Sequence, residues 1–129
     1  MTGNLVKDNR CFTKWKDGGW KTLSISGTGI TAGSVTPKYR VINDRIYIRG
    51  TISADMSTAS LPVKIAELPE GARPAEVKYE LIAGEGDRMA RLYVNTSGEV
   101  YLNYFKTYAG ESITSGTYWV QIDTDFFNG

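Results

Sequence analysis

The sequence predicts an all-β protein, an antiparallel β-sandwich or jelly roll. Apolar and polar residues alternate along many short segments, as they do in strands that bury one face. Turn signals separate roughly eight to ten such segments and recur about every ten residues. No segment has a sustained apolar repeat at helical spacing, and the one helix-compatible window, residues 73–80, is short and contains a proline.

Length and composition are those of one soluble globular domain. The chain has 129 residues, of which 41% are hydrophobic and 12% aromatic, so a sizeable core can form. We therefore expect residues 1–129 to form a single β-sandwich domain. No apolar run could span a bilayer, so we expect no membrane insertion. Because 15 basic residues offset 14 acidic ones, the net charge of +1 gives no general attraction for nucleic acid.

The N-terminal part of the chain carries weaker signals. We expect a short strand or arm over residues 5–9 and a second apolar patch over residues 12–15. Cys11 is the single cysteine and cannot form an internal disulfide, and residues 1–5 do not have the basic-then-apolar pattern expected of a signal segment. Asp17-Gly18-Gly19 predicts a turn, and a strand begins at Trp20. Residues 26–34, rich in glycine and hydroxyl groups, are expected to be the longest loop, mobile or dependent on a partner.

Residues 38–74 contain the clearest strand and turn signals. Alternating runs over residues 39–41 and 46–52 flank Asn43-Asp44, which predicts a tight hairpin because both residues tolerate positive φ. A polar loop over residues 54–60 and a strand over residues 61–68 follow, with Val63 and Ile65 inward. Residues 69–74 hold two prolines and a glycine, so pairing must stop there and the chain must turn.

The C-terminal half predicts four further strands. They cover residues 77–82, 90–95, 99–108 and 117–123, with turns at residues 84–87 and 96–98. Alternation places one set of side chains together on one face: Ala90, Leu92, Val94, Val100, Leu102, Tyr104, Tyr118, Val120 and Ile122. The opposite face then carries Arg91, Tyr93, Asn95, Tyr101, Asn103, Phe105, Trp119, Gln121 and Asp123.

Residue types disfavour catalysis and metal binding. The chain has no histidine, which excludes histidine-dependent triads and metal sites, and Cys11 without a histidine is a poor nucleophile. A glycoside hydrolase could use two carboxylates, but the nearby pairs, Glu85/Asp87 and Asp123/Asp125, lie in or beside turns, where acidic residues are common. Residues 123–125 lack the further oxygen ligands of a calcium loop. We expect no enzymatic activity, metal or cofactor.

Aromatic and arginine side chains gather on the predicted outer faces. Such rings can pack at subunit interfaces, stack on the C–H faces of sugars while arginine bonds hydroxyl groups, or lie partly buried in a single subunit. Phe105 belongs to this outward aromatic set. The candidate ligand-binding residues are Tyr47, Arg49, Arg91, Tyr93, Tyr101 and Trp119.

The order of five segments resembles the C-terminal β-sandwich modules of bacteriophage tail-tip, baseplate and receptor-binding proteins, especially from phages and prophages of Gram-positive hosts. The segments cover residues 20–23, 37–40, 46–52, 65–74 and 92–100. The most specific is Leu68-Pro69-Glu70-Gly71-Ala72-Arg73-Pro74, similar to the family's "Leu-Pro-x-Gly-aromatic-Arg-Pro" turn, with Ala72 in place of the aromatic residue. The closing strand differs from the one that the family leads us to expect.

The resemblance implies a role in the virion, either structural or in host adsorption. It implies a homo-oligomer, commonly a trimer, that contacts other tail proteins and often a bacterial cell-surface saccharide. We therefore expect a non-enzymatic tail module, the C-terminal part of a longer protein made in the host cytoplasm and acting at the bacterial surface. A purely structural module that mediates oligomerisation or docking is the alternative.

Overall fold

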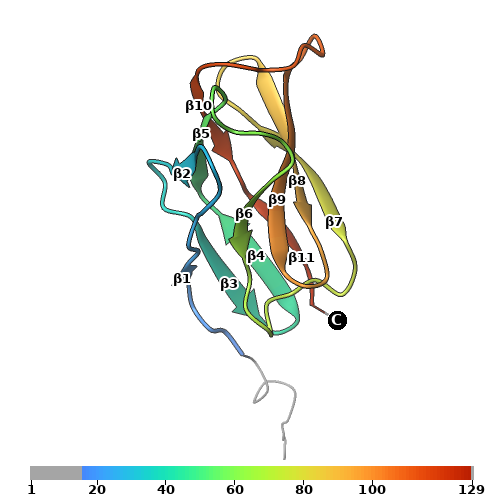
Figure 1. Cartoon of the computed structure of the whole chain (residues 1–129). Coiled ribbons are helices and arrows are strands. Elements are labelled where there is room, and N and C mark those ends of the chain that lie inside the picture. Colours follow the sequence, from blue (N-terminus) through green and yellow to red (C-terminus); the bar gives the residue numbers. More distant parts are fainter. Residues whose placement is uncertain (1–15, 129) are drawn as a thin grey trace, which may run out of the picture.

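The structure is a computed structural model that describes residues 16–128, in which eleven antiparallel strands form a β-sandwich (Figure 1). The predicted all-β class is confirmed. The described residues contain no helix, and hence none that could cross a membrane. The predictions for residues 5–9, Cys11 and residues 12–15 fall outside the described part of the chain. The strands are β1 (Lys21–Thr22), β2 (Ile30–Ala32), β3 (Lys38–Ile42), β4 (Arg45–Arg49), β5 (Thr51–Asp55), β6 (Val63–Glu67), β7 (Lys78–Ala83), β8 (Arg88–Val94), β9 (Glu99–Thr107), β10 (Thr117–Gln121) and β11 (Thr124–Phe127).

One layer consists of two sheets joined by a bend at Gly50. The first sheet has the order β1-β3-β4-β11 and the second the order β10-β5-β2, so the chain changes sheet between β4 and β5. Gly50 has a φ of +130°, and a Cβ there would lie 2.6 Å from the Cα of Pro37. The chain between β10 and β11 bends beside it, since Ile122 N–H donates to the Gly50 carbonyl at 2.9 Å. Glycine permits this corner because it has no side chain.

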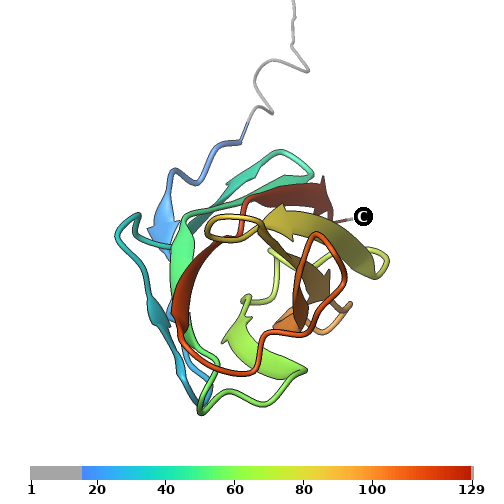
Figure 2. The same ribbon diagram turned by 90° about the horizontal axis from the view of Figure 1, so that it is seen from above.

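The second layer is the four-stranded sheet β6-β9-β8-β7. Figure 2 shows the three sheets curving around a common interior. Hydrogen bonds connect the layers at their margins. Ser26 N–H donates to the Ile65 carbonyl at 2.8 Å, and Glu85 N–H donates to the Trp119 carbonyl at 3.0 Å. The interior is therefore enclosed on more sides than in an open sandwich.

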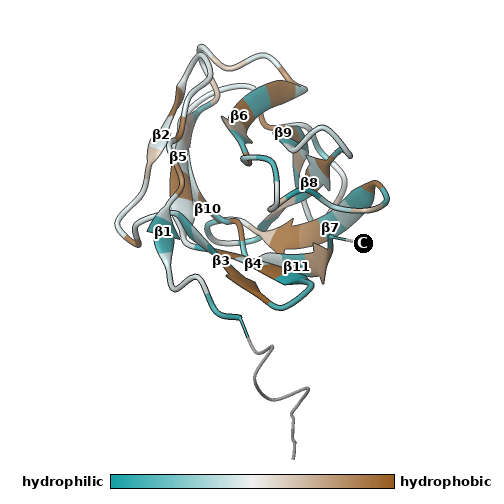
Figure 3. Cartoon of the chain, turned by 90° about the horizontal axis from the view of Figure 1, so that it is seen from below, coloured by the Kyte–Doolittle hydropathy of each residue, from teal (hydrophilic) through white to brown (hydrophobic). Residues whose placement is uncertain are grey.

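A single apolar core fills this interior. Apolar and polar positions alternate along the strands (Figure 3), and the apolar ones point inward. The predicted inward positions of β8 and of the first half of β9 are confirmed, because Ala90, Leu92, Val94, Val100 and Leu102 are all buried. The first layer contributes a matching set of buried residues: Ile46, Ile48, Ile52, Ala54, Val120 and Ile122.

The predicted turns are confirmed. Asn43 and Asp44 connect β3 to β4, whose residues Ile42 and Arg45 pair directly, and Asn43 has a φ of 55°. The prediction of a turn at residues 17–19 is also correct, since Asp17 Oδ1 accepts a hydrogen bond from Gly19 N–H at 2.9 Å. In the proline-bounded turn, Ala72 N–H donates to the Pro69 carbonyl at 3.0 Å.

Three predicted boundaries are wrong. Residues 26–34 are not one loop, because Ile30 is buried and anchors β2 against β5. The predicted polar loop over residues 54–60 is wrong at its start, because Ala54 is fully buried within β5. The predicted final strand ends at Gln121, and a further strand, β11, pairs with β4 after the bend. Each difference comes from tertiary pairing that local alternation does not show.

A β-bulge in β9 inverts the predicted orientation of the residues after Leu102. Arg91 of β8 lies opposite Tyr104, whereas Leu92 lies opposite Leu102, so Asn103 is an additional residue in the ladder. Phe105, predicted to face outward, is therefore buried, with 2% of its surface exposed. Tyr104, predicted to face inward, lies on the outer side. A bulge shifts every later side chain by one position.

Candidate ligand-binding faces

The six predicted ligand-binding residues lie on three sheets rather than in one site. Arg91, Tyr93 and Tyr101 share the outer face of the β6-β9-β8-β7 layer. Two others, Tyr47 and Arg49, lie together on β4, where the Arg49 Cζ atom is 5.7 Å from the centre of the Tyr47 ring.

Trp119 stands apart from both groups on β10, with 44% of its surface exposed. The structure therefore supports two candidate faces, one on each layer, and places Trp119 in neither.

The first face is a shallow depression on the β6-β9-β8-β7 layer, with a volume of about 270 Å³. We call the residues that line it the tyrosine face: Pro62, Tyr79, Tyr93, Tyr101 and Asn103. The register of the sheet creates it, because Tyr79 lies directly opposite Tyr93, and Tyr93 directly opposite Tyr101. Each of three neighbouring strands thus contributes one tyrosine to a single row.

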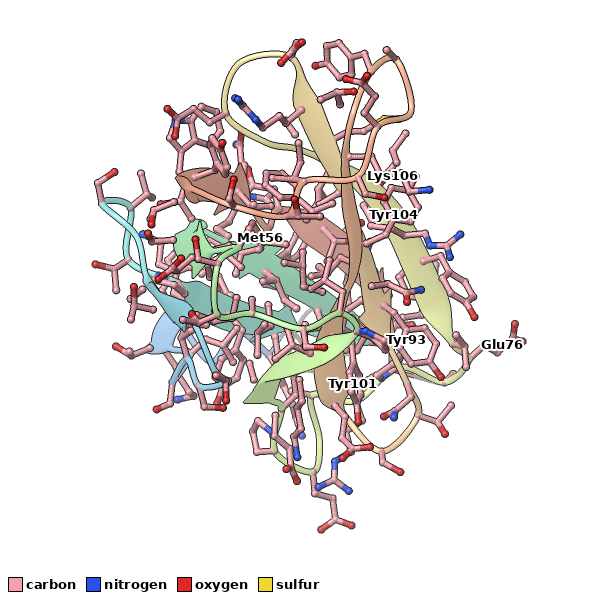
Figure 4. All side chains as sticks on the ribbon, turned by 45° about the horizontal axis from the view of Figure 1, so that its top comes forward. Met56, Glu76, Tyr93, Tyr101, Tyr104 and Lys106 are labelled. Atoms are coloured by element: carbon pink, nitrogen blue, oxygen red, sulfur yellow. The ribbon has the colours of Figure 1, made fainter. Side chains whose placement is uncertain are left out.

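The three tyrosine rings contact one another without stacking flat. The ring centres of Tyr79 and Tyr93 are 5.1 Å apart and those of Tyr93 and Tyr101 5.9 Å apart, with tilts of 44° and 53°. Figure 4 shows Tyr93 and Tyr101 on adjacent strands of this layer. Cross-strand aromatic pairs stabilise a sheet. Tyr79 nevertheless has 56% of its surface exposed, so the row also offers ring surface to a ligand.

Arg91 provides a positive charge beside this row. Its Cζ atom lies 5.2 Å from the centre of the Tyr79 ring and 5.1 Å from the centre of the Tyr104 ring, a cation–π arrangement with both. The Nε atom of Arg91 is buried and has no hydrogen-bond partner within residues 16–128. The two rings hold the guanidinium group in place, so it is positioned before any ligand arrives.

The bulge at Asn103 joins the tyrosine face to a second depression of about 480 Å³. Asn103 lines both depressions, because the bulge directs Asn103 and Tyr104 to the same outer side. Bulges commonly redirect side chains beside functional sites. Lys106 stands over the Tyr104 ring, with its Nζ atom 5.5 Å from the ring centre (Figure 4). The remaining polar residues that line the second depression are Ser60, Ser112 and Thr114.

The second candidate face lies on the layer that bends at Gly50, called the bent layer below, and surrounds a depression of about 300 Å³. We call four of its lining residues the tryptophan face: Trp20, Lys38, Arg49 and Gln121. Trp20 has 42% of its surface exposed. Its ring centre lies 5.4 Å from the Nζ atom of Lys38 and 5.5 Å from the Cζ atom of Arg40.

Three carboxylates of the predicted acidic pairs, Glu85, Asp123 and Asp125, have structural partners. Asp125 accepts a hydrogen bond from Arg45 Nε at 2.9 Å, and Glu85 Oε1 accepts one from Trp119 N–H at 3.2 Å. Asp123 accepts hydrogen bonds from Gly50 N–H at 3.0 Å and from the Gln121 amide at 2.7 Å. Residues 16–128 contain no group of three or more cysteine, aspartate or glutamate side chains placed to hold a metal ion.

Among the carboxyl groups of residues 16–128, two have clearly shifted pKa values, and both shifts are downward. Hydrogen bonds from Arg40, and next from Gly19 N–H, lower the pKa of Asp17 from its usual 3.8 to about 2. Hydrogen bonds from Asn95, and next from Lys64, lower the pKa of Glu99. A general acid needs a raised pKa, so these two groups suit ion pairing rather than proton donation.

Comparison with known proteins identifies the fold. No protein-family model matches the chain, and no curated protein is significantly similar to it. Among solved structures, the chain is similar to the crystal structure of the receptor-binding protein of Listeria phage PSA, with a TM-score of 0.56 and 17% sequence identity. The match covers 89% of this chain and 73% of that one. At this identity the likeness concerns the fold alone, so the chain shares its fold with that protein.

Proposed function

We propose that the chain is a non-enzymatic module of a phage or prophage tail that binds a bacterial cell-surface saccharide through the tyrosine face. The observation that carries the proposal is the row formed by Tyr79, Tyr93 and Tyr101 around an open depression, with Asn103 beside it. Tyrosine presents an apolar ring and a polar hydroxyl group, which match the C–H face and the hydroxyl groups of a sugar. The asparagine amide can both donate and accept hydrogen bonds.

The two depressions that meet at Asn103 suit more than one sugar ring. A first ring would stack in the tyrosine face, and a second would lie near Tyr104 and Lys106 along β9. Both depressions are open and shallow, so each site should bind weakly. Several copies of a weak site gain affinity when they engage one surface together. A homotrimer in the virion tail, held there by other tail proteins, would supply this avidity.

A glycan array with the purified chain tests the proposal. We expect binding to bacterial surface saccharides, and Tyr93→Ala should weaken it about tenfold or more, which corresponds to about 1.4 kcal/mol or more. The matched control is Tyr108→Ala, since Tyr108 is 65% exposed and lines neither depression. Light scattering must first establish the native oligomer. Failure of that oligomer to bind any saccharide would contradict the proposal.

The alternative function is a structural module that oligomerises or docks onto another tail protein. Its supporting observation is an exposed apolar row that begins just before β7 and continues along it, formed by Val77, Tyr79 and Leu81. Leu81 has 59% of its surface exposed. Exposed rows of this kind are typical of interaction surfaces. We expect Leu81→Lys to dissociate an oligomer formed through this row, measured by sedimentation. A wild-type chain that sediments as a monomer would count against this function.

Catalysis is the least favoured class. Turnover of cell-wall polysaccharide that disappears in Glu85→Gln or Asp123→Asn would overturn the non-enzymatic proposal.

A further inference from the structure

We propose a second ligand site at the tryptophan face, which takes a sugar unit that carries a negatively charged substituent, either phosphate or carboxylate. It lies on the bent layer, whereas the tyrosine face lies on the β6-β9-β8-β7 layer. The two sites share no residue, so each can be tested without the other.

The first argument is a like-charge pair in the sheet. Lys38 of β3 lies directly opposite Arg49 of β4, and both side chains line the same depression. Like charges directly opposite each other destabilise a pair of strands. Within residues 16–128, no carboxylate forms an ion pair with either side chain. An anion bound between them would turn this repulsion into attraction.

The second argument is that the neighbouring carboxylates are already engaged. Asp17 forms an ion pair with Arg40, the other cation beside Trp20. Asp123 lines the depression, but one of its oxygens accepts a hydrogen bond from Gly50 N–H and the other from the Gln121 amide. The charges of Lys38 and Arg49 thus exceed the single charge of Asp123 in the depression.

The third argument concerns the positions of the cations and of the ring. The Trp20 ring holds the Lys38 ammonium group by a cation–π contact, and the Tyr47 ring does the same for the Arg49 guanidinium group. The two cations are therefore placed before a ligand binds. Trp20 also supplies exposed aromatic surface for the sugar ring.

NMR titration with four probes tests the site: glucose 1-phosphate, glucuronate, glucose and inorganic phosphate. The signal to follow is the Trp20 indole N–H, identified through its loss in Trp20→Phe. We expect glucose 1-phosphate or glucuronate to shift this signal at concentrations at least about tenfold lower than glucose does, and the tighter of the two to identify the charged group. Inorganic phosphate should bind more weakly than the charged sugar, because it has no ring to contact Trp20.

Charge-removing variants complete the test. Lys38→Gln and Arg49→Gln should each weaken binding of the charged sugar about tenfold or more. Lys21→Gln, a matched change at an exposed lysine that lines neither depression of the β6-β9-β8-β7 layer nor the tryptophan face, should not. Lys38→Gln should also unfold at an equal or higher urea concentration, because it relieves the like-charge pair. Equal binding of glucose and the charged sugars, or unchanged binding by both variants, would overturn the proposal. Tyr93→Ala should leave this site intact, so failure here is distinct from failure of the tyrosine face.

Discussion

Replacing Gly50 by alanine should destabilise the fold by several kcal/mol, because the corner between β4 and β5 has no room for a Cβ atom. The φ of +130° is strained for any residue with a side chain, at about 1–3 kcal/mol. The new atom would lie 2.6 Å from the Cα of Pro37 and 2.8 Å from its nitrogen, and such overpacking adds about 1–3 kcal/mol. The expected loss is about 2–6 kcal/mol, against a usual domain stability of about 5–15 kcal/mol.

Urea unfolding followed by tryptophan fluorescence measures this loss as a lower midpoint with an unchanged slope. Gly71→Ala is the matched control, since Gly71 has a φ of +96° but no atom within 4 Å of the position where its Cβ would lie. It should lose only the conformational part, about 1–3 kcal/mol. If both variants unfold at the same urea concentration, the close approach to Pro37 does not contribute and the reasoning is wrong.

Three further predictions concern the core, an ion pair and the bulge. Leu102→Ala should lower the free energy of unfolding by about 2–5 kcal/mol, because Leu102 is fully buried; a smaller loss by thermal unfolding would mean that the site collapses around the change. Asp17→Asn should be less stable than the wild type above pH 4, because the folded protein stabilises the charged form of Asp17 and so lowers its pKa. The difference in stability should vanish as the pH falls towards about 2 and Asp17 becomes protonated. A difference that does not depend on pH would contradict this. Deletion of Asn103 should preserve the inward positions of Leu102 and Phe105 but weaken saccharide binding, and loss of folding by circular dichroism would show that the bulge is structural instead.

The sequence was sufficient for the fold class because alternation and turn chemistry are local. Asn43-Asp44 determines its hairpin by conformational preference, and the prolines at residues 69–74 end pairing wherever they lie. The corner at Gly50 was not predicted, because alternation continues from Ile48 through the glycine to Ile52. Only the pairing partners show that residues 46–52 belong to two sheets, because β4 pairs with β11 whereas β5 pairs with β10.

The outward positions of the candidate residues were predicted in part, and the errors have two causes. Arg91, Tyr93 and Tyr101 were placed correctly because β8 and the start of β9 alternate regularly. The outward position of Tyr104 was not predicted, because the bulge adds Asn103 to the strand. The sequence pattern up to Leu102 does not indicate this additional residue.

Tyr79 lines the tyrosine face but was not among the predicted ligand-binding residues, for a different reason. It belongs to the apolar row of Val77, Tyr79 and Leu81, which alternation alone would place in the core. In the structure this row faces outward, and the alternate residue Glu80 accepts a hydrogen bond from the Thr124 hydroxyl group at 3.0 Å. Pro62 and Asn103 join the tyrosine face only through the tertiary fold.

The most direct measurement is to locate a bound saccharide on the protein by NMR, with a ligand taken from the glycan array. The proposal predicts that the largest shifts fall on Tyr79, Tyr93, Tyr101 and Asn103 and fade towards the first layer. Shifts confined to other surfaces, with these four residues unchanged, would contradict the assignment of the tyrosine face as the adhesive surface.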